Sequence, residues 1–308
     1  MTDTDNFFPV EQVNFSGFSK DIDLSRADIE GEKLWNLIFQ RDLNFGGMLT
    51  GIFGIMGSGK TSMLHHITRR IMKENPNELV FWREPLNNPL QVHNNGCNFQ
   101  ILCEKRHPVT VKILSDHGLI QTDDIPVRLF SGFKDLLKKA ETGLINVVYL
   151  DDLSRWIRLI DVLKLTYGWK TCIFDEMEDV TPMRVSGKSW TLNEQFANSL
   201  KEIRKSYISI VYNTQSQMDL DYRISSKTMM HCYLYGSRKD EHSPIFKGTL
   251  QALELGSAWL DLARARFGLI KFDPVLPQQP TYYVVPDRRR KDKKEERSSF
   301  DELSQQEV

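Results

Sequence analysis

Cysteine is scarce in this sequence of 308 residues, and no metal-binding spacing accompanies it. The four cysteines stand at positions 97, 103, 172 and 232, so they form neither a CxxC pair nor the spacing of a zinc site. This excludes a zinc finger and a CxxC redox centre. It also suits a reducing, intracellular compartment, where disulfides are rare.

Long apolar runs and an excess of charge are absent as well. No apolar stretch approaches the ~18 residues of a membrane span, and residues 1–6 are acidic and polar, unlike a signal peptide. We therefore expect a cytoplasmic protein with no direct membrane insertion. A net charge of -1 gives no global basic field for nucleic acid, although a local basic patch stays open.

One short stretch, residues 54–61, stands out against this ordinary background. It reads Gly-Ile-Met-Gly-Ser-Gly-Lys-Thr and fits the P-loop or Walker A template GxxxxGK[ST]. The apolar residues 48–53 before it suit a buried strand. Residues 62–72 after it carry apolar side chains at helical spacing. The sequence thus predicts strand, glycine loop and helix, which is the context that the motif needs.

The chemistry of this stretch is phosphate binding. Glycines let the backbone approach an anion closely, and loop N–H groups and the helix N-terminus present positive partial charge to it. Lys60 can reach the β- and γ-phosphates, and the Thr61 hydroxyl can ligate Mg²⁺. A glycine turn that binds nothing is the alternative, which the flanking strand and helix disfavour. We expect ATP and Mg²⁺ as ligands. The candidate nucleotide-binding residues are Gly54, Gly57, Ser58, Gly59, Lys60, Thr61 and Ser62.

A second pattern, the apolar residues 171–174 followed by Asp175 and Glu176, fits the Walker B motif. Asp175 would hold the Mg²⁺ shell, and Glu176 would polarise the attacking water. The alternative is a solvated strand end; Glu178 and Asp179 are expected to be surface charge. A later predicted strand, 208–212, ends in polar residues 213–215, and amides at such a tip can sense a γ-phosphate or orient water.

The remaining pattern alternates strands and helices, which predicts the α/β class. We expect an N-terminal arm and helix (1–45), an ATPase domain (46–273), a linker and last strand (274–287) and a charged, disordered tail (288–308). The further predicted strands are 79–82, 98–102, 109–114, 126–130, 145–150 and 229–235. The further predicted helices are 133–140, 153–165 and 192–205, and residues 181–190 are predicted to form a loop.

The order of these motifs resembles the FtsK/HerA superfamily of ATPases over about residues 46–240. That group includes DNA translocases, conjugation coupling ATPases, viral genome-packaging ATPases and zonula occludens toxin-like phage assembly proteins. The resemblance implies a RecA-like P-loop NTPase fold with a mostly parallel central sheet flanked by helices. It also implies a homohexameric ring with nucleic acid in its channel. The shortness of the chain favours the compact viral or plasmid packaging type.

The resemblance implies further roles for single residues. Gln215 matches the glutamine at the tip of the strand after Walker B. Arg204 or Lys205 matches the basic pair that faces the neighbouring subunit's nucleotide in such rings, and Arg223 matches a later arginine. A cation acting in trans would stabilise charge on the transferring phosphoryl group. The catalytic candidates are therefore Glu176, Lys60, Arg204 and Gln215, and the metal candidates are Thr61 and Asp175.

Two functions remain open at this point. The first is a ring motor that hydrolyses ATP to translocate or package double-stranded DNA. The second is an ATPase for virion or filament assembly or export, acting on protein. Basic pore residues would favour the first, with Lys105, Arg106, Arg184 and Lys188 as candidates, although a solvated surface is the better interpretation of each. A P-loop kinase or switch would need an acceptor site, of which the sequence has no signature.

Overall fold

The computed structural model describes most of the chain between residues 24 and 287. The described residues are 24–43, 46–84, 89–116, 118–150, 152–183, 185–217, 219–237, 250, 253–263, 266–273 and 281–287. The predicted arm before residue 24 and the predicted tail from residue 288 lie outside this set.

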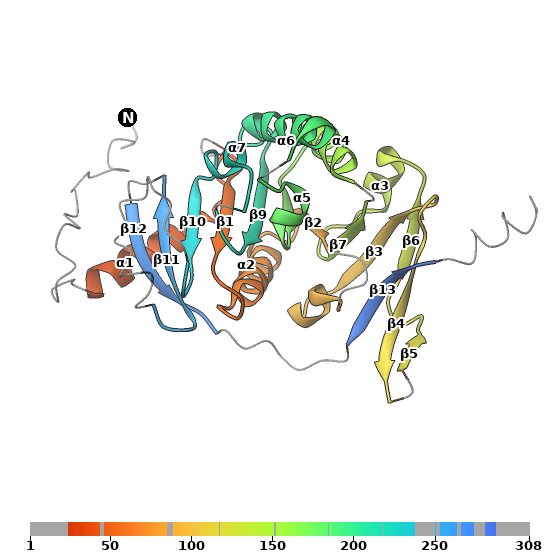
Figure 1. Ribbon diagram of the computed structural model, residues 1–308, viewed down its shortest axis with the longest axis horizontal. Helices are drawn as coiled ribbons and strands as arrows, with labels where there is room; N and C mark the ends of the chain where they lie inside the picture. Colours follow the sequence, from red (N-terminus) through yellow and green to blue (C-terminus); the bar gives the residue numbers. More distant parts are fainter. Residues whose placement is uncertain are drawn as a thin grey trace, which may run out of the picture.

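The centre of the molecule is a ten-stranded sheet in the order β12-β11-β10-β1-β9-β8-β2-β7-β3-β6 (Figure 1). The strands from β10 to β6 in this order are parallel to one another. Strand β11 runs in the opposite direction and pairs antiparallel with both β10 and β12. The central strands are buried along their whole length because helices cover both faces. The strands are β1 Leu49–Phe53, β2 Leu79–Arg83, β3 Phe99–Glu104, β6 Val127–Phe130, β7 Ile145–Tyr149, β8 Lys170–Phe174, β9 Ile208–Thr214, β10 Met230–Tyr233, β11 Ser257–Leu262 and β12 Arg266–Lys271.

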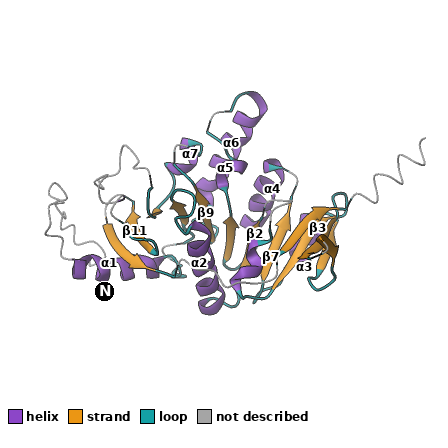
Figure 2. Cartoon of the chain, turned by 60° about the horizontal axis from the view of Figure 1, so that its bottom comes forward, coloured by secondary structure: helices purple, strands orange, loops and turns teal. Residues whose placement is uncertain are grey.

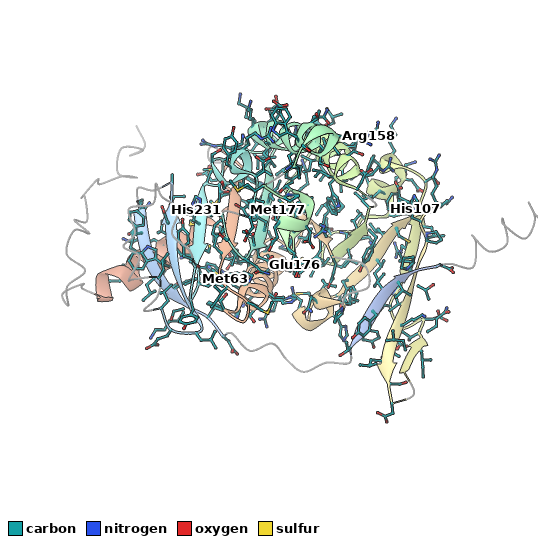
Figure 3. All side chains as sticks on the ribbon, viewed as in Figure 1. Met63, His107, Arg158, Glu176, Met177 and His231 are labelled. Carbon is teal, nitrogen blue, oxygen red and sulfur yellow. The ribbon has the colours of Figure 1, made fainter. Side chains whose placement is uncertain are left out.

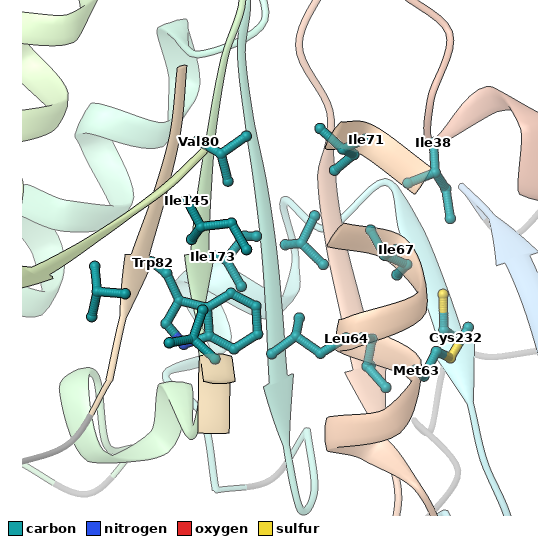
Figure 4. Packing of buried hydrophobic residues seen from close by; sticks show 14 of the residues in the cluster. Ile38, Met63, Leu64, Ile67, Ile71, Val80, Trp82, Ile145, Ile173 and Cys232 are labelled. Carbon is teal, nitrogen blue, oxygen red and sulfur yellow. The ribbon is translucent and has the colours of Figure 1, made fainter. Parts of the chain in front are cut away.

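Helices pack on the two faces of this sheet and form two hydrophobic clusters (Figure 2). On one face lie α1 Leu24–Leu37 and α2 Lys60–Glu74; Leu64, Ile67 and Ile71 of α2 belong to the same cluster as Val80 and Ile173 of the sheet (Figure 4). The other face carries α3 Phe133–Lys139, α4 Leu153–Lys164, α5 Met177–Val180, α6 Gly187–Ser199 and α7 Tyr222–Ser225. The predicted mostly parallel sheet flanked by helices is confirmed.

A smaller sheet lies at the β6 end of the molecule, in the order β13-β4-β5. It consists of β4 Val109–Ser115, β5 Gly118–Gln121 and β13 Tyr282–Pro286. β13 pairs antiparallel with β4, from Tyr282 opposite Ile113 to Pro286 opposite Val109. The predicted strands 98–102 and 109–114 therefore both exist, as β3 and β4, but they belong to different sheets.

The segment after Walker B differs from its prediction. Residues 181–190 were predicted as a loop, yet α6 already begins at Gly187 and ends at Ser199, short of the predicted end at residue 205. A 3-10 turn, Leu200–Glu202, follows. The helix starts early because its buried side chains, Asn193, Phe196 and Ala197, pack on the core and outweigh the loop-like composition of residues 187–189.

Helix α1 docks on β12 through a contact between two glycines. A Cβ placed on Gly31 would lie 1.9 Å from the carbonyl oxygen of Leu269, and one on Gly268 would lie 2.2 Å from the Gly31 nitrogen. The ion pair between Arg266 and Glu30 closes over the same contact. Helix α1 therefore packs on β12 through direct contact between the two backbones.

Candidate functional site

The glycine loop lies where β1 ends and α2 begins, at the carboxyl edge of the sheet. Gly59 is the N-cap of α2 in a left-handed conformation (φ 92°), and its carbonyl accepts a 2.9 Å hydrogen bond from the Met63 N–H. The 15-residue helix that follows points its N-terminus into the loop. This geometry places the free N–H groups of the first turn where they can bind an anion.

Lys60 spans the loop from inside. Its Nζ donates to the carbonyl oxygens of Gly54 at 2.8 Å and Ile55 at 3.0 Å. Partial burial lowers the pKa of Lys60, while the carboxylates of Glu178 and Asp175 act in the opposite direction. The ammonium group of Lys60 therefore donates its hydrogen bonds to carbonyl groups of the loop. When a nucleotide is bound, phosphate oxygens would replace these carbonyls as its acceptors.

The hydroxyl groups of the loop differ in their surroundings. Thr61 is half-buried in the first turn of α2, and Ser62 beside it is buried. The Ser58 hydroxyl is buried and, within the described part of the chain, makes no hydrogen bond. A polar atom of this kind in a phosphate-binding loop can be satisfied by a ligand.

The two Walker B acids are held by an amide from the neighbouring strand. β9 lies between β1 and β8, and Tyr212 pairs with Phe174, so Asn213 lies level with Asp175. The Asn213 Nδ2 donates to the Asp175 Oδ1 at 2.5 Å, and its Oδ1 accepts from the Glu176 N–H at 2.7 Å. One side chain thus fixes both members of the acidic pair.

Glu176 has an unusual backbone. Its φ is 53°, a left-handed conformation that is rare for a residue other than glycine, asparagine or aspartate, and its side chain is exposed. Strained backbone of this kind persists where the surroundings hold it in place. Partial burial together with the nearby carboxylates of Asp175 and Asp179 raises the pKa of Glu176 above its ordinary value. The carboxyl group is therefore a stronger base than an isolated glutamate.

Asp175 itself is buried and surrounded by charge. Burial raises its pKa, and Glu178 adds to this effect, whereas Asn213, Arg83 and Lys60 oppose it. Arg83, the last residue of β2, donates from Nη1 to the Asp175 carbonyl at 2.7 Å and approaches that of Glu176 at 3.4 Å. The guanidinium group therefore holds the Walker B strand end through its backbone and supplies positive charge to the acidic cluster.

The tip of β9 is tied to the same cluster by a second contact. The Gln215 N–H donates to the Glu178 Oε1 at 3.1 Å, while the Gln215 side chain is exposed. Glu178, expected to be surface charge, is half-buried, and its Oε2 is enclosed without a hydrogen bond within the described residues. Figure 3 labels Glu176 near the centre of the molecule, between the elements that carry these residues.

The basic candidates lie elsewhere. Arg204 and Lys205 are in the turn before β9, where the Arg204 carbonyl accepts from the Gly47 N–H at 3.0 Å. This is the opposite edge of the sheet, the length of the seven-residue strand β9 away, or about 23 Å. Arg223 pairs with Asp221 at 2.6 Å and lies 4.6 Å from the centre of the Trp190 ring.

Three of the four candidate pore residues are described, and they lie in two separate segments. Lys105 and Arg106 are exposed in the turn after β3, Lys188 is exposed in the first turn of α6, and Arg184 lies outside the described residues. The structure thus brings Lys60, Asp175 and Glu176 together with the β9 tip and leaves the basic residues apart.

Sequence reasoning missed two residues of the site. Arg83 falls just outside the predicted strand 79–82, and Asn213 appears in the sequence only as one of the polar residues 213–215 at a strand tip. Arg83 contacts Asp175 from 92 positions away in the sequence, and Asn213 contacts it from 38 positions away. Only knowledge of the strand order could have predicted these contacts.

Among the described residues, no group of three or more His, Cys, Asp or Glu side chains is placed to hold a metal ion. Mg²⁺ at phosphates commonly takes only one or two carboxylates, with the phosphates and water completing its shell, and Thr61 and Asp175 fit that donor set. None of the helices in the described part of the chain combines the length and the apolar character needed to cross a membrane.

No family model matches this chain, and no curated protein matches it either. Similar solved structures exist. The genome packaging NTPase B204 from Sulfolobus turreted icosahedral virus 2, in complex with AMPPCP, is 12% identical with a TM-score of 0.48, covering 75% of this chain and 99% of that one. The N-terminal domain of zonular occludens toxin from Neisseria meningitidis is 17% identical with a TM-score of 0.35, covering 74% and 95%.

A third similar structure is EccC (ATPases 2 and 3) from Thermomonospora curvata, in complex with a signal sequence peptide. It is 12% identical with a TM-score of 0.41, covering 77% of this chain and 38% of that one. All three are similar to this chain in fold. The strand order and the loop geometry show that the chain has a RecA-like P-loop NTPase fold of the α/β class.

Proposed function

We propose that this chain is a Mg²⁺-dependent ATPase that assembles into a ring, a hexamer, and translocates or packages double-stranded DNA. One observation carries the hydrolytic part of the proposal. The loop with Lys60 and the acids Asp175 and Glu176 converge at one edge of the sheet, and Asn213 holds both acids in place.

Each residue has a role in this chemistry. The loop N–H groups and Lys60 bind the phosphates, and Lys60 stabilises the charge that develops on the transferring phosphoryl group. Glu176 accepts the proton of the attacking water, for which its raised pKa suits it. Thr61 and Asp175 would hold Mg²⁺, which neutralises phosphate charge when bound. Two carboxylates at the site favour water over another acceptor.

The ring is supported by the placement of the basic turn before β9. Arg204 and Lys205 lie at the edge of the sheet opposite their own loop, so they could act on a bound nucleotide only if it belonged to another subunit. A heterologous, head-to-tail contact of this kind closes into a ring when its rotation permits. A viral or plasmid origin and DNA as cargo rest on the resemblance in motif order.

The test is ATP turnover measured with and without double-stranded DNA at two salt concentrations. We expect DNA to stimulate turnover and the stimulation to fade with salt, because phosphate contacts release counterions. Lys60→Ala should lose nucleotide binding and turnover, whereas Glu176→Gln should keep binding and lose turnover.

Lys73→Ala, an exposed lysine in the last turn of α2, is the matched control and should behave like the unmodified chain. Turnover that survives in Lys60→Ala or Glu176→Gln would overturn the site. Turnover that is intact but indifferent to DNA would instead favour a protein substrate, as in virion assembly or export.

A further inference from the structure

An aromatic ring stands beside the phosphate loop on the side away from the carboxylates. Tyr235 follows the end of β10, the strand that pairs with β1 opposite to β9. The register of β1 and β10 ends with Phe53 opposite Tyr233, so Ile55 and Tyr235 each follow the end of their strand by two residues. Tyr235 is 44% exposed, and Ile55 is 43% exposed. Two apolar side chains thus face solvent next to the phosphate-binding backbone.

The segment that carries Tyr235 is fixed to the loop strand. The Leu234 N–H donates to the Phe53 carbonyl at 2.8 Å, and the Ser237 Oγ lies 2.6 Å from the same oxygen. Gly236, in between, has φ +70°, and a Cβ on it would lie 2.7 Å from the Ile55 Cδ1. Tyr235 is therefore presented by a segment that contacts the loop directly, and its position is set by that contact.

The direction in which a bound nucleotide lies follows from the carboxylates. Asp175 and Glu176 at the end of β8 mark the place of the terminal phosphate and its metal ion, two strands from β1 on one side. The nucleoside end must then extend to the other side, toward β10. From β8 to β10 there are three strand spacings, or about 14 Å, which an extended nucleoside triphosphate can bridge.

We infer that Tyr235 is the platform on which the base of the bound nucleotide stacks, with Ile55 as the apolar edge of the same subsite. This inference rests on the proposed nucleotide binding and adds the subsite for the base. Every base has a π-face, and a purine offers the larger one, so stacking favours purine over pyrimidine nucleotides without choosing between adenine and guanine.

The experiment compares two ligands that differ in the nucleoside. Calorimetry with Mg²⁺ would give the Kd of ATP and of inorganic tripolyphosphate for the unmodified chain and for Tyr235→Ala. We expect Tyr235→Ala to raise the Kd of ATP about 5- to 150-fold, the range for losing a base-stacking ring, and to leave that of tripolyphosphate unchanged. Tyr235→Phe should bind ATP as the unmodified chain does, because it keeps the ring.

The controls separate the possible failures. Tyr167→Ala removes a fully exposed tyrosine near the start of β8, at the other edge of the sheet, and should change neither Kd. If Tyr235→Ala binds ATP normally, or if it weakens both ligands equally, the base platform is wrong while nucleotide binding stands. If the unmodified chain binds neither ligand, the proposed function fails, and the inference fails with it.

Discussion

Asn213 shows how much of a site can depend on one amide. Its side chain satisfies the Asp175 carboxylate and the Glu176 N–H together. Removing it leaves a buried carboxylate oxygen without its donor and releases the left-handed Glu176 backbone, at a cost of about 1–3 kcal/mol for each lost partner. Since Asn213 does not belong to the phosphate loop, this cost falls on the geometry of the acids and spares the binding of phosphates.

We therefore expect Asn213→Ala to keep nucleotide binding within a few-fold and to lower turnover about 10- to 100-fold, as misplacement of a general base does. Steady-state turnover and ATP binding by calorimetry check this. Asn198→Ala, an exposed asparagine on α6, is the control. Equal losses of binding and turnover would show that Asn213 supports the loop rather than the acids.

His65 makes stability depend on pH. It is fully buried in α2, stacks on Trp82 with ring centres 5.3 Å apart, and neither of its ring nitrogens has a hydrogen-bond partner within the described residues. Burial, with Arg69 and His66 adding positive charge nearby, lowers the pKa of His65 from 6.5 to about 3. The unfolded chain therefore binds a proton at a pH where the folded chain does not.

The free energy of unfolding should consequently fall as pH drops from about 6.5 to about 3, with this residue contributing up to about 1.4 kcal/mol per pH unit. His65→Phe should remove that contribution and leave stability near pH 7 within about 1.5 kcal/mol. Urea titrations across this pH range would measure it, with His107→Phe on the exposed turn after β3 as the control. If the unmodified chain and His65→Phe lose stability in parallel as pH falls, His65 is not the source of the pH dependence.

The residues of the site divide by how they could be predicted. The phosphate loop and the acids Asp175 and Glu176 are local motifs made of residues that are adjacent in the sequence, so they can be recognised there. The structure places the two motifs together. Arg83 and Asn213 reach the same acids from other strands, and their role depends on strand order, which no local pattern encodes. Glu178 was misjudged for the same reason, because its partner Gln215 directly follows β9.

At the scale of elements, the contact of α1 with β12 sets two effects against each other. Helix propensity alone predicts that Gly31→Ala stabilises α1 by about 1 kcal/mol. The added methyl group would, however, meet the Leu269 carbonyl at 1.9 Å, so the helix must move away from the strand. Overpacking of this kind costs about 1–3 kcal/mol or more, and we expect it to prevail.

Gly31→Ala should thus lower the free energy of unfolding by about 1–2 kcal/mol, measured by urea denaturation. Glu32→Ala, at the next and exposed position of α1, is the control, since it shortens a side chain on the solvent side of the same helix. A Gly31→Ala protein that is more stable than the original would show that propensity outweighs the contact.

Helices and strands were predictable where their burial leaves a recognisable pattern of apolar residues in the sequence. The central strands are continuous apolar runs because both of their faces are covered, and the sequence predicts them well. Strand β5 was missed because its four residues are all exposed and it has no buried face. That β3 and β4 enter different sheets also escaped prediction, because β4 pairs with β13, some 170 positions further along the chain.

At the scale of the whole molecule, the proposed ring makes a prediction about mixtures. Arg204→Ala and Glu176→Gln should each abolish turnover alone. Mixed in equal amounts, subunits with an intact Glu176 will stand beside neighbours with an intact Arg204 at about a quarter of the interfaces by random head-to-tail pairing. We expect those sites to hydrolyse ATP.

Turnover of the mixture, compared with each variant alone, measures this effect. Repeating it with Lys205→Ala and Arg223→Ala in place of Arg204→Ala would identify which cation acts across the interface. A mixture as inactive as its components would place Arg204 in its own subunit's chemistry or in folding. The domain boundaries and the number of six subunits per ring remain predictions.

Strand β9 connects these scales. Its carboxyl end carries Asn213 among the acids, its amino end follows the turn with Arg204, and all seven of its residues are buried between two parallel neighbours. Sliding this strand along its axis would break its hydrogen bonds with both neighbouring strands at once. We therefore expect β9 to move as one unit, so that a shift at its Asn213 end also displaces the turn with Arg204. In the proposed ring, β9 would couple the nucleotide site of each subunit to the site of its neighbour.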